Sequence, residues 1–462
     1  MLFFMSIPFL NRQDEDRRLR AALRAEPPVL AVIYGRRRCG KSTLLRRVAG
    51  PRDVYFLANQ SDAALQRAAL AAQIARTVAG FDAAVYPSWD ALLRSLADRA
   101  PRRLSLFIDE FPYLAQTSPE IPSVLQGFLE GAGAQRVNLV LCGSSQRMMH
   151  GLVLDRAAPL YGRAREILKI RPLAAGWIRP ALALDGAKAV EAYAVWGGVP
   201  RYWELARDYR SLEDAVATLV LDRNGILHEE PLRLLLDDMR AAGQAHSLLA
   251  LIAAGCHRLC EIAGRMEKPA GMLTRPLSNL IDLGYVRREC PFGENPKTAK
   301  RTVYKLNDPF LQFHYRFVQA HQSMLELGLT RAVGAAVKLA FSPHVAGVWE
   351  ALARDSAPLI RPGNTQWGAA SRWWGTGADG KPLELDVVAE SLDRNSLLLG
   401  EAKWTASRED ARRILARLED RVQRLPFVRG RRVVLALWVK GKVQVPGDAA
   451  VLTPDDVLGA LV

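Results

Sequence analysis

The stretch from Val32 to Leu45 constrains the fold of this chain most, because its pattern predicts a strand, a glycine-framed loop and a helix. The loop matches G-x-x-x-x-G-K-[ST] in full, through Gly35, Gly40, Lys41 and Ser42. Glycines at the ends of the loop permit backbone angles that other residues resist, so the amide groups can turn inward around a phosphate at a helix N-terminus. The spacing therefore predicts a site for a nucleoside triphosphate, with ATP as the cofactor.

Residues of this loop have predicted roles toward the triphosphate. We expect Lys41 to reach the β- and γ-phosphates and the Ser42 hydroxyl to bind Mg²⁺. Arg38, Cys39 and Thr43 are also predicted to contact the nucleotide. A chance turn is the alternative, but the apolar run before the loop and the helical spacing after it favour the nucleotide site.

A second apolar run ends in two carboxylates. The run from Leu104 to Ile108 has the continuous hydrophobicity of a parallel strand buried on both faces, and Asp109 and Glu110 follow it. Such sheets bind ligands at the carboxyl ends of their strands, so both acids are expected beside the phosphates. Asp109 would hold the Mg²⁺ shell, and Glu110 would orient and deprotonate the attacking water. A solvated strand end is the alternative for this pair.

Polar residues after the next predicted strand are candidates for sensing the γ-phosphate. The strand from Val137 to Gly143 is followed by Ser144 and Ser145, and either could contact the γ-phosphate or the attacking water. A helix N-cap at Ser145 is the alternative. Further on, Arg163 or Arg165 could act as an arginine finger, in cis or toward a neighbouring subunit, or could be a surface arginine.

The length of the chain limits the number of domains, and its net charge limits the class of partner. The 462 residues favour three or four compact units. The net charge of +15 would attract a polyanion such as nucleic acid, although a generally basic surface is the alternative. Five cysteines without metal-ligand spacing are typical of a reducing cytoplasm. The apolar opening of residues 1–10 is too short to span a bilayer, so we expect a cytoplasmic protein without a membrane partner.

A different pattern runs from His246 to Leu306. Apolar residues at helical spacing predict two helices and a third from about Leu273 to Leu283, followed by two strands around the loop 291–300. This is the pattern of a winged helix-turn-helix. Pro276 must then lie in the first turn of the third helix, where a missing N–H is tolerated.

The third helix and the loop carry residues suited to DNA. Expected toward a major groove are Thr274, Arg275, Ser278 and Asn279, and expected on phosphates are Lys297, Lys300 and Arg301. Such modules also serve as protein-docking or lid elements, which stays open as the alternative.

The last part of the chain brings a second group of acids together with a lysine. Strand side chains repeat every two positions, so Glu401 and Lys403 share one face of a predicted strand, and a hairpin can set Asp386 beside them. Glu350, in an upstream helix, is a candidate third acid. Convergent carboxylates bind Mg²⁺ or Mn²⁺, and an adjacent lysine can position or deprotonate water for attack on a phosphodiester. A solvated or purely structural face is the alternative.

Two family resemblances follow from these motifs. The order of phosphate loop, Asp-Glu strand, Gly-Ser-Ser strand and Tyr161-Gly162-Arg163 resembles the archaeal-type ATPases, an AAA+/STAND-related P-loop family. Trp196 to Tyr202 looks like the Gly-Gly-x-Pro lid motif of that family, which implies a sensor role for Arg201. Cys39 departs from the small aliphatic residue that is commoner in such loops.

The final domain resembles the PD-(D/E)XK nuclease superfamily, in the form that often ends archaeal-type ATPases. By this resemblance Asp386 and Glu401 are metal ligands, Lys403 is the catalytic lysine, and Glu350 is an additional ligand. A leucine precedes Asp386 where the superfamily name has a proline, which leaves an inactive fold open.

The sequence thus predicts an α/β chain with a P-loop ATPase core on a parallel sheet of the ASCE/AAA+ type. Predicted domains are the core at 1–172, a helical lid at 173–240, a winged helix-turn-helix at 241–310, a helical linker at 311–344 and an α/β restriction-endonuclease-like domain at 345–462. We expect an ATP-hydrolysing enzyme coupled to a DNA-binding winged helix and a metal-dependent nuclease domain, with homo-oligomerisation left open. The alternative is an ATP-gated DNA-binding regulator whose terminal domain is inactive, and a further rival is a protein remodeller.

Overall fold

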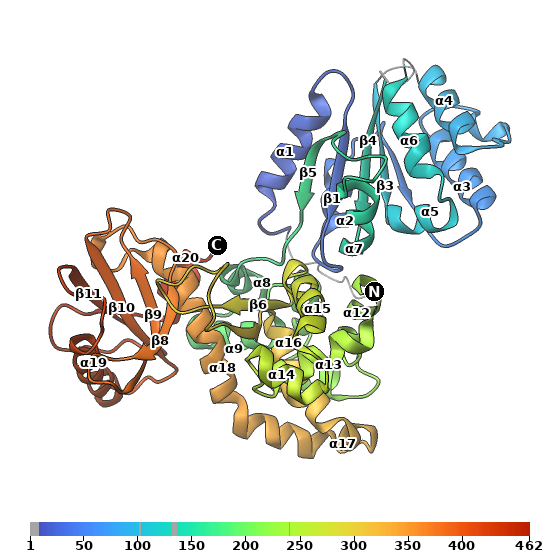
Figure 1. The fold of residues 1–462 in the computed structure, drawn as a ribbon. Coiled ribbons are helices and arrows are strands. Elements are labelled where there is room, and N and C mark those ends of the chain that lie inside the picture. The colour runs from blue at the N-terminus through green and yellow to red at the C-terminus, as the bar shows by residue number, and fades with distance from the viewer. Residues whose placement is uncertain (1–8, 101–102, 132–135, 240) are drawn as a thin grey trace. The chain divides into compact units, whose positions relative to one another are not determined.

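The structure is a computed structural model that describes residues 9–100, 103–131, 136–239 and 241–462. Contacts between elements divide the chain into two compact units (Figure 1). The N-terminal unit contains residues 9–172 and 236–239, and the C-terminal unit contains residues 173–235 and 241–462. Most of the apolar opening stretch, residues 1–8, lies outside the described residues.

A five-stranded parallel sheet forms the centre of the N-terminal unit. Its strands stand in the order β2-β3-β4-β1-β5, with every neighbouring pair parallel. The bounds are Leu30–Tyr34 for β1, Val54–Leu57 for β2, Leu104–Asp109 for β3, Val137–Gly143 for β4 and Ala164–Lys169 for β5. Strand β4 thus stands between the strand before the phosphate loop and the strand that ends in the acids. The predicted α/β fold with a parallel sheet is confirmed.

Helices pack around this sheet (Figure 1). They are α1 (Gln13–Arg24), α2 (Lys41–Val48), α3 (Ala63–Ala75), α4 (Trp89–Arg99), α5 (Phe111–Thr117), α6 (Ile121–Glu130) and α7 (Gln146–Met149). Every residue of β3 and β4 is buried, as their continuous apolar sequences predict. The core that they share with α3, α4 and α6 fixes the carboxyl ends of the strands, where the candidate ATP site lies.

The C-terminal unit begins with short helices. Three helices and a two-stranded antiparallel sheet follow in the order predicted for a winged helix-turn-helix, and residues 242–306 are called the winged helix below. The first group is α8 (Ile178–Leu182), α9 (Gly186–Trp196), α10 (Pro200–Ala206), α11 (Leu212–Val216) and α12 (Glu230–Asp238), of which residues 236–238 are assigned to the N-terminal unit. The second is α13 (Ala242–Ala253), α14 (Leu259–Met266), α15 (Ala270–Asp282) and the antiparallel strands β6 (Val286–Glu289) and β7 (Val303–Leu306).

One detail of the winged helix differs from the prediction. Helix α15 begins at Ala270 rather than near Leu273, so Pro276 lies inside the helix and not in its first turn. The expectation for Pro276 was wrong because Ala270 and Gly271 extend the helix backward by one turn, where nothing in the apolar spacing marks a start. The helix interior therefore lacks one N–H donor.

A mixed five-stranded sheet ends the chain. Its order is β12-β11-β10-β9-β8, in which β8, β9 and β10 are antiparallel and β10, β11 and β12 are parallel. The bounds are Ser371–Thr376 for β8, Pro382–Glu390 for β9, Ser396–Lys403 for β10, Arg432–Val439 for β11 and Ala450–Leu452 for β12. Helix α19 (Arg408–Gln423) packs on one face of this sheet through an apolar core, and α20 (Pro454–Ala460) follows the last strand.

The connection into this sheet is helical. It consists of α16 (Pro309–Phe313), α17 (Gln322–Glu326) and α18 (Thr330–Ile360), and α18 contacts both β9 and β10. Single 3-10 or π turns are η1 (Phe81–Ala83), η3 (His150–Leu154), η4 (Ala175–Trp177), η5 (Ala217–Leu221), η6 (His314–Val318), η7 (Gln319–His321) and η8 (Pro362–Asn364). The boundaries predicted at 241, 311 and 345 all fall inside the C-terminal unit, so that finer partition stays a prediction.

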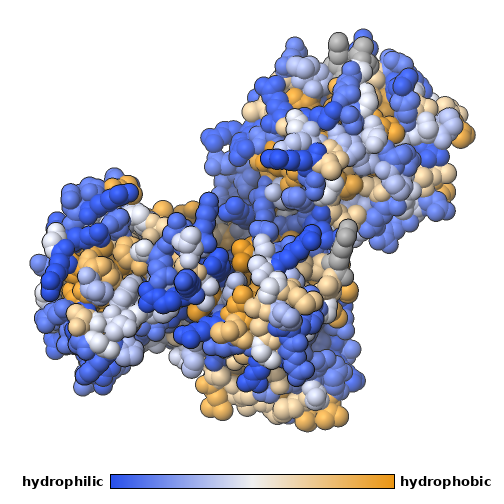
Figure 2. Space-filling model, in the orientation of Figure 1, coloured by the Kyte–Doolittle hydropathy of each residue, from blue (hydrophilic) through white to orange (hydrophobic). Residues whose placement is uncertain are grey.

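The surface is mainly hydrophilic on the face drawn in Figure 2, with scattered apolar residues. Of the helices in the described part of the chain, none combines the length and the apolar character that crossing a membrane requires.

Candidate functional site

The phosphate loop is shaped by its two glycines. Gly35 has a φ of 145°, and a Cβ at this position would lie 2.2 Å from the carbonyl oxygen of Ile170. Gly40 is the N-cap of α2 with a φ of 89°. A side chain is thus excluded at Gly35 by both backbone angle and space, and disfavoured at Gly40 by the angle alone. These glycines let the loop turn closely between β1 and α2.

Lys41 is held by the loop itself. Its Nζ donates to the carbonyl oxygens of Gly35 at 2.8 Å and Arg36 at 2.9 Å, and the residue is only 5% exposed. Carbonyl dipoles neutralise an ammonium only in part, so its charge stays available to a phosphate. The first turn of α2, Lys41-Ser42-Thr43, carries no acid that would repel an anion. The donor set therefore fits a triphosphate.

The other predicted loop residues have different exposures. Cys39 is 1% exposed, and its carbonyl oxygen accepts from Arg12 Nη2 at 3.2 Å, so this residue can offer a ligand its backbone only. Arg38 adopts a φ of 66°, and Ser42 is half-buried while Thr43 is exposed. Arg12 was not singled out from the sequence, because nothing in its local pattern indicates a contact with a loop 27 residues away.

The two acids at the end of β3 make different contacts. Asp109 is 1% exposed, accepts from the Tyr55 hydroxyl at 2.6 Å and from the backbone N–H of Glu110 at 3.0 Å. Glu110 has a φ of 55°, which is rare for a residue with a side chain and is typical of functional sites. Its carboxylate accepts from the N–H of Ser144 at 3.2 Å and from its hydroxyl at 2.9 Å. The structure therefore brings Glu110 and Ser144 together.

Cys142 links the acids to the phosphate loop. This buried thiol lies in β4, between β1 and β3. Burial raises its pKa well above the usual value, the charge of Asp109 adds to this, and the charge of Lys41 opposes it. In the sheet register Tyr34 of β1 pairs with Gly143 and Ile108 of β3 pairs with Leu141, so the phosphate loop and Asp109 lie at the carboxyl ends of the two strands that flank β4. Neither Cys142 nor Tyr55 was predicted, since a residue inside an apolar strand carries no sequence signal for such a contact.

Four residues remain as candidates for the γ-phosphate sensor, the arginine finger and the lid sensor. Ser145 accepts from the N–H of Met148 at 3.3 Å as the N-cap of α7, which is the alternative that the sequence left open. Arg163 and Arg165 are both exposed, and Arg163 pairs with Glu130 at 2.5 Å. Arg201 lies in the C-terminal unit and pairs with Glu204 at 2.9 Å. Finger and sensor roles for these arginines stay predictions.

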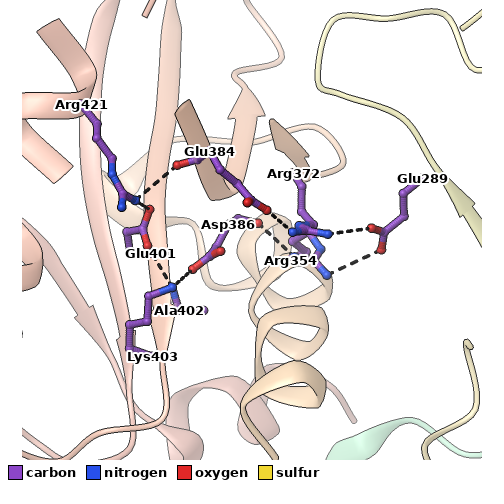
Figure 3. Close-up of polar contacts among 9 residues, drawn as sticks. All are labelled: Glu289, Arg354, Arg372, Glu384, Asp386, Glu401, Ala402, Lys403 and Arg421. Carbon is purple, nitrogen blue, oxygen red and sulfur yellow. Dashed lines mark hydrogen bonds and ion pairs between the residues drawn. The ribbon is translucent and has the colours of Figure 1, made fainter. Parts of the chain in front are cut away.

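The hairpin of β9 and β10 brings three predicted residues of the second site together (Figure 3). Lys403 Nζ donates to Asp386 Oδ2 at 2.5 Å and lies 3.0 Å from Glu401 Oε2. The N–H of Ala402 donates to the same Asp386 oxygen at 3.1 Å. Both acids are nearly buried, at 6% exposed for Asp386 and 3% for Glu401.

A second cation, Arg421 on α19, completes this group. Its Nη1 donates to Glu401 Oε1 at 2.5 Å and to the carbonyl oxygen of Glu384 at 3.3 Å. Arg421 was missed because the spacing of α19 indicates only an amphipathic helix. Two cations thus face two carboxylates, and the four formal charges balance.

The surroundings of Glu401, Asp386 and Lys403 shift the pKa values of these groups in different directions. Burial raises the pKa of Glu401 to about 7, and the charge of Asp386 adds to this. Burial also disfavours charge on Asp386, but Lys403 outweighs it and holds the pKa of Asp386 below its usual value. The two acids in turn outweigh burial at Lys403 and raise its pKa. At neutral pH Glu401 therefore lies close to its titration midpoint.

Glu350 lies on α18, which packs on β9 and β10. Burial raises its pKa, and the charge of Asp386 raises it further. Within the ranges that the structure describes, no three His, Cys, Asp or Glu side chains are grouped closely enough to hold a metal ion. Mg²⁺ is commonly bound by one or two carboxylates together with waters and substrate phosphates, so the donor set of Asp386 and Glu401 is sufficient for that mode.

The winged helix exposes its predicted DNA-facing residues. Thr274, Arg275, Ser278 and Asn279 on α15 are all exposed, as are Lys297, Lys300 and Arg301. Arg301 is already engaged, because its guanidinium pairs with Glu294 at 2.5 Å. In the C-terminal sheet, Trp373 is buried against Phe427 in the core, and Arg372 forms ion pairs.

The fold and the loop geometry define a P-loop ATPase domain followed by a separate C-terminal sheet domain. Residues 9–204 match the family model described as an ATPase domain predominantly from Archaea. Residues 314–414 match the model described as archaeal and bacterial proteins of unknown function. Residues 9–204 are therefore similar to ATPase domains of the archaeal type, and the nuclease character predicted for the C-terminal domain stays a prediction.

The chain also resembles individual proteins. An uncharacterized protein of Methanocaldococcus jannaschii, MJECL04, is 27% identical over 408 residues, which cover 86% of this chain and 87% of that protein. The Walker-type ATPase PABY2304 of Pyrococcus abyssi aligns with a TM-score of 0.48 and 20% identity, over 66% of this chain and 95% of its own. The ORC2 protein of Aeropyrum pernix, in ADPNP and ADP complexes, aligns with a TM-score of 0.45 and 16% identity, over 70% of this chain and 96% of its own.

Proposed function

We propose that this chain is an ATPase that acts on DNA, in which ATP hydrolysis in the N-terminal unit is coupled to metal-dependent phosphodiester cleavage by the C-terminal sheet domain. The winged helix supplies DNA binding through the exposed residues of α15 and the loop that follows β6. The net charge of +15 supports a polyanionic substrate.

The single observation that carries the nuclease part is the position of Lys403. Its ammonium contacts the nearly buried carboxylates of both Asp386 and Glu401, which come from two adjacent strands. The two acids are the ligands we assign to Mg²⁺ or Mn²⁺, with Glu350 behind them on α18. A bound divalent ion supplies charge neutralisation at the phosphate and a more acidic water. Lys403, which stays protonated between the two acids, would orient that water.

The ATPase part assigns roles to residues that meet at one sheet edge. Lys41 would exchange the carbonyl oxygens of the loop for the β- and γ-phosphates. Ser42 and Asp109 would hold Mg²⁺. Glu110 deprotonates the attacking water once Ser144 releases its carboxylate. The contact between Glu110 and Ser144 thus holds the base away from water until nucleotide binding rearranges it.

A nicking assay tests the nuclease part. Supercoiled plasmid is incubated with the full chain, ATP and Mn²⁺, and the nicked form is measured on a gel. The wild type and Glu267→Gln, which removes an exposed carboxylate of the winged helix, should both nick the plasmid. Asp386→Asn should lose the activity by at least roughly 100-fold, because one of two metal ligands is gone. Equal nicking by Asp386→Asn would contradict the proposal.

A second candidate function rests on Arg421. Because Arg421 and Lys403 already balance the charges of Glu401 and Asp386, the group is complete without a cation. This observation favours an ATP-gated DNA-binding regulator with an inactive terminal domain. Such a regulator would show DNA-stimulated ATP turnover with no nicking by wild type, whether Mg²⁺ or Mn²⁺ is supplied.

A further inference from the structure

The wing of the winged helix, residues 290–302 between β6 and β7, is docked on the C-terminal sheet domain. The N–H of Phe292 donates to the carbonyl oxygen of Arg372 in β8 at 2.8 Å. The Phe292 ring packs against Phe427 with centroids 5.7 Å apart. Arg301 Nη1 donates to the carbonyl oxygen of Trp374 at 3.3 Å. The wing, which a winged helix commonly places on nucleic acid, is therefore held by another domain of its own chain.

Glu289, the last residue of β6, lies among several arginines (Figure 3). Its carboxylate lies 3.5 Å from Arg372 and 3.8 Å from Arg354, and it binds Arg287 of its own strand at 2.7 Å. Burial opposes its charge, but Arg287 and Arg354 outweigh burial and lower the pKa of Glu289 to about 2. Glu289 is thus a fully ionised anion that the winged helix places between Arg354 of α18 and Arg372 of β8.

The fit between this anion and the two arginines of the C-terminal domain is loose. Among the residues that the structure describes, Arg354 Nη2, Arg372 Nε and Glu289 Oε2 are buried without a hydrogen-bond partner. Arg354 as a whole is only 7% exposed, so water cannot readily replace the missing partner. A carboxylate offers two oxygens in one plane, whereas a phosphate offers more oxygens in a tetrahedron and is bound by arginine in pairs of hydrogen bonds. The two donors are better matched to a phosphate than to Glu289.

The same two arginines adjoin the candidate nuclease site. Arg354 Nη1 donates to the carbonyl oxygen of Asp386 at 3.0 Å, and Arg372 pairs with Glu384, two residues earlier on β9. One guanidinium, that of Arg354, therefore separates the position of the Glu289 carboxylate from the strand that carries Asp386 (Figure 3). A phosphate in place of Glu289 would lie beside the acid site rather than at a remote surface.

We infer that Arg354 and Arg372 form a binding subsite for a backbone phosphate of nucleic acid, and that the wing residue Glu289 occupies this subsite as an internal substitute when no nucleic acid is bound. The inference deepens the proposed function and rests on its DNA-binding part. Binding of DNA exchanges the Glu289 carboxylate for a phosphodiester and withdraws the wing from β8. Docking of the wing thereby keeps the winged helix and the acid site from engaging DNA separately.

The competing explanation is that Glu289 forms only a structural ion pair. The two explanations predict different effects when the Glu289 carboxylate is removed. If Glu289 only docks the wing, its loss leaves buried arginines uncompensated and weakens the fold without any gain for a ligand. If Glu289 substitutes for a phosphate, its loss removes the anion that competes with the ligand for the two arginines. DNA affinity then rises, and the rise depends on Arg372.

The test measures binding of a fluorescein-labelled DNA duplex to the full chain by fluorescence anisotropy over a series of salt concentrations. Glu289→Gln should bind roughly tenfold tighter than wild type, and the slope of log K against log salt should steepen by about 1 to 2, one unit for each additional phosphate contact. Adding Arg372→Gln to Glu289→Gln should abolish this gain. Glu267→Gln is the matched control, because it removes one exposed carboxylate from the same winged helix, and any gain it gives should be independent of Arg372→Gln.

A second variant keeps the test valid if Glu289→Gln unfolds. Phe292→Ala loosens the wing at Phe427 without touching the charges, and it should also raise DNA affinity in an Arg372-dependent way. The subsite would be overturned if wild type binds DNA and if the DNA affinities and salt slopes of Glu289→Gln and Phe292→Ala equal those of Glu267→Gln. That result would leave the proposed function intact. Failure of every form, wild type included, to bind DNA would overturn the proposed function and the subsite with it.

Discussion

At the scale of single residues, the two candidate sites use a lysine in opposite states. Within the described part of the chain, Lys41 donates to carbonyl oxygens of its loop and forms no ion pair, so its positive charge is available to an incoming phosphate. Lys403 is held by two carboxylates, so its charge is already matched, and a ligand there must compete with it or replace it. Lys41 is therefore ready to bind an anion. At the second site, a metal cation would have to replace Lys403 as the partner of Asp386 and Glu401.

Glu110 gives a direct prediction for ATP hydrolysis. Glu110→Gln should retain ATP binding but lower turnover by roughly 10²- to 10⁴-fold, since the proposed general base is lost while the phosphate loop is intact. Phosphate release measures turnover, and a fluorescent ATP analogue measures binding. Ser144→Ala is the companion variant, because it removes the hydroxyl that holds Glu110. Unchanged turnover in Glu110→Gln would assign the base elsewhere.

Glu401 predicts a pH dependence for the second site. Burial and Asp386 raise the pKa of Glu401 to about 7, so the protonated, neutral form prevails below that pH. A carboxylate binds a cation only when charged, so Mn²⁺ affinity at this site should fall as pH is lowered below about 7, approaching tenfold per pH unit. The measurement is a calorimetric titration of Mn²⁺ into wild type and into Glu401→Gln. Any Mn²⁺ binding that remains in Glu401→Gln should lack this dependence on pH. A wild-type profile identical to that of Glu401→Gln at all pH values would refute the assignment.

At the scale of elements, the parts that the sequence predicted well are those whose signal is local. The apolar runs of β3 and β4 led to buried parallel strands, and the two-residue period of β10 correctly put Glu401 beside Lys403. The start of α15 was wrong, because Ala270 and Gly271 give no periodic signal.

Other contacts of the site could not be predicted at all. Arg421 reaches Glu401 from a helix 20 residues away, Tyr55 reaches Asp109 across 54 residues, and Glu289 meets Arg372 from another domain. Such pairs depend on how elements pack, and neither spacing nor residue type encodes that in one sequence. The resemblance to known families supplied the roles of residues, while their partners came only from the structure.

The turn between β1 and α2 predicts a stability difference between its two glycines. Gly35→Ala combines a disfavoured φ with a clash against Ile170, so it should lower the stability of the N-terminal unit by about 3 kcal/mol or more. Gly40→Ala meets nothing within 4 Å and should cost only the backbone strain, about 1 to 2 kcal/mol. Scanning calorimetry of the full chain measures both, and equal losses would contradict the close approach at Gly35.

At the scale of the whole molecule, the account places two chemistries in two units of one chain. The phosphate loop and its acids belong to the N-terminal unit, while the winged helix, the wing contact and the acid site of β9 and β10 all belong to the C-terminal unit. The residues proposed to bind and cleave DNA thus belong to the C-terminal unit, and those proposed to bind ATP belong to the N-terminal unit.

The measurement that tests this claim most directly is a parallel assay of ATP turnover and plasmid nicking in the same samples of wild type, Lys41→Ala and Asp386→Asn. The account predicts that Lys41→Ala lowers turnover by at least roughly 100-fold and that Asp386→Asn loses nicking but keeps turnover within about threefold of wild type. Turnover that survives Lys41→Ala, or nicking that survives Asp386→Asn, would contradict it.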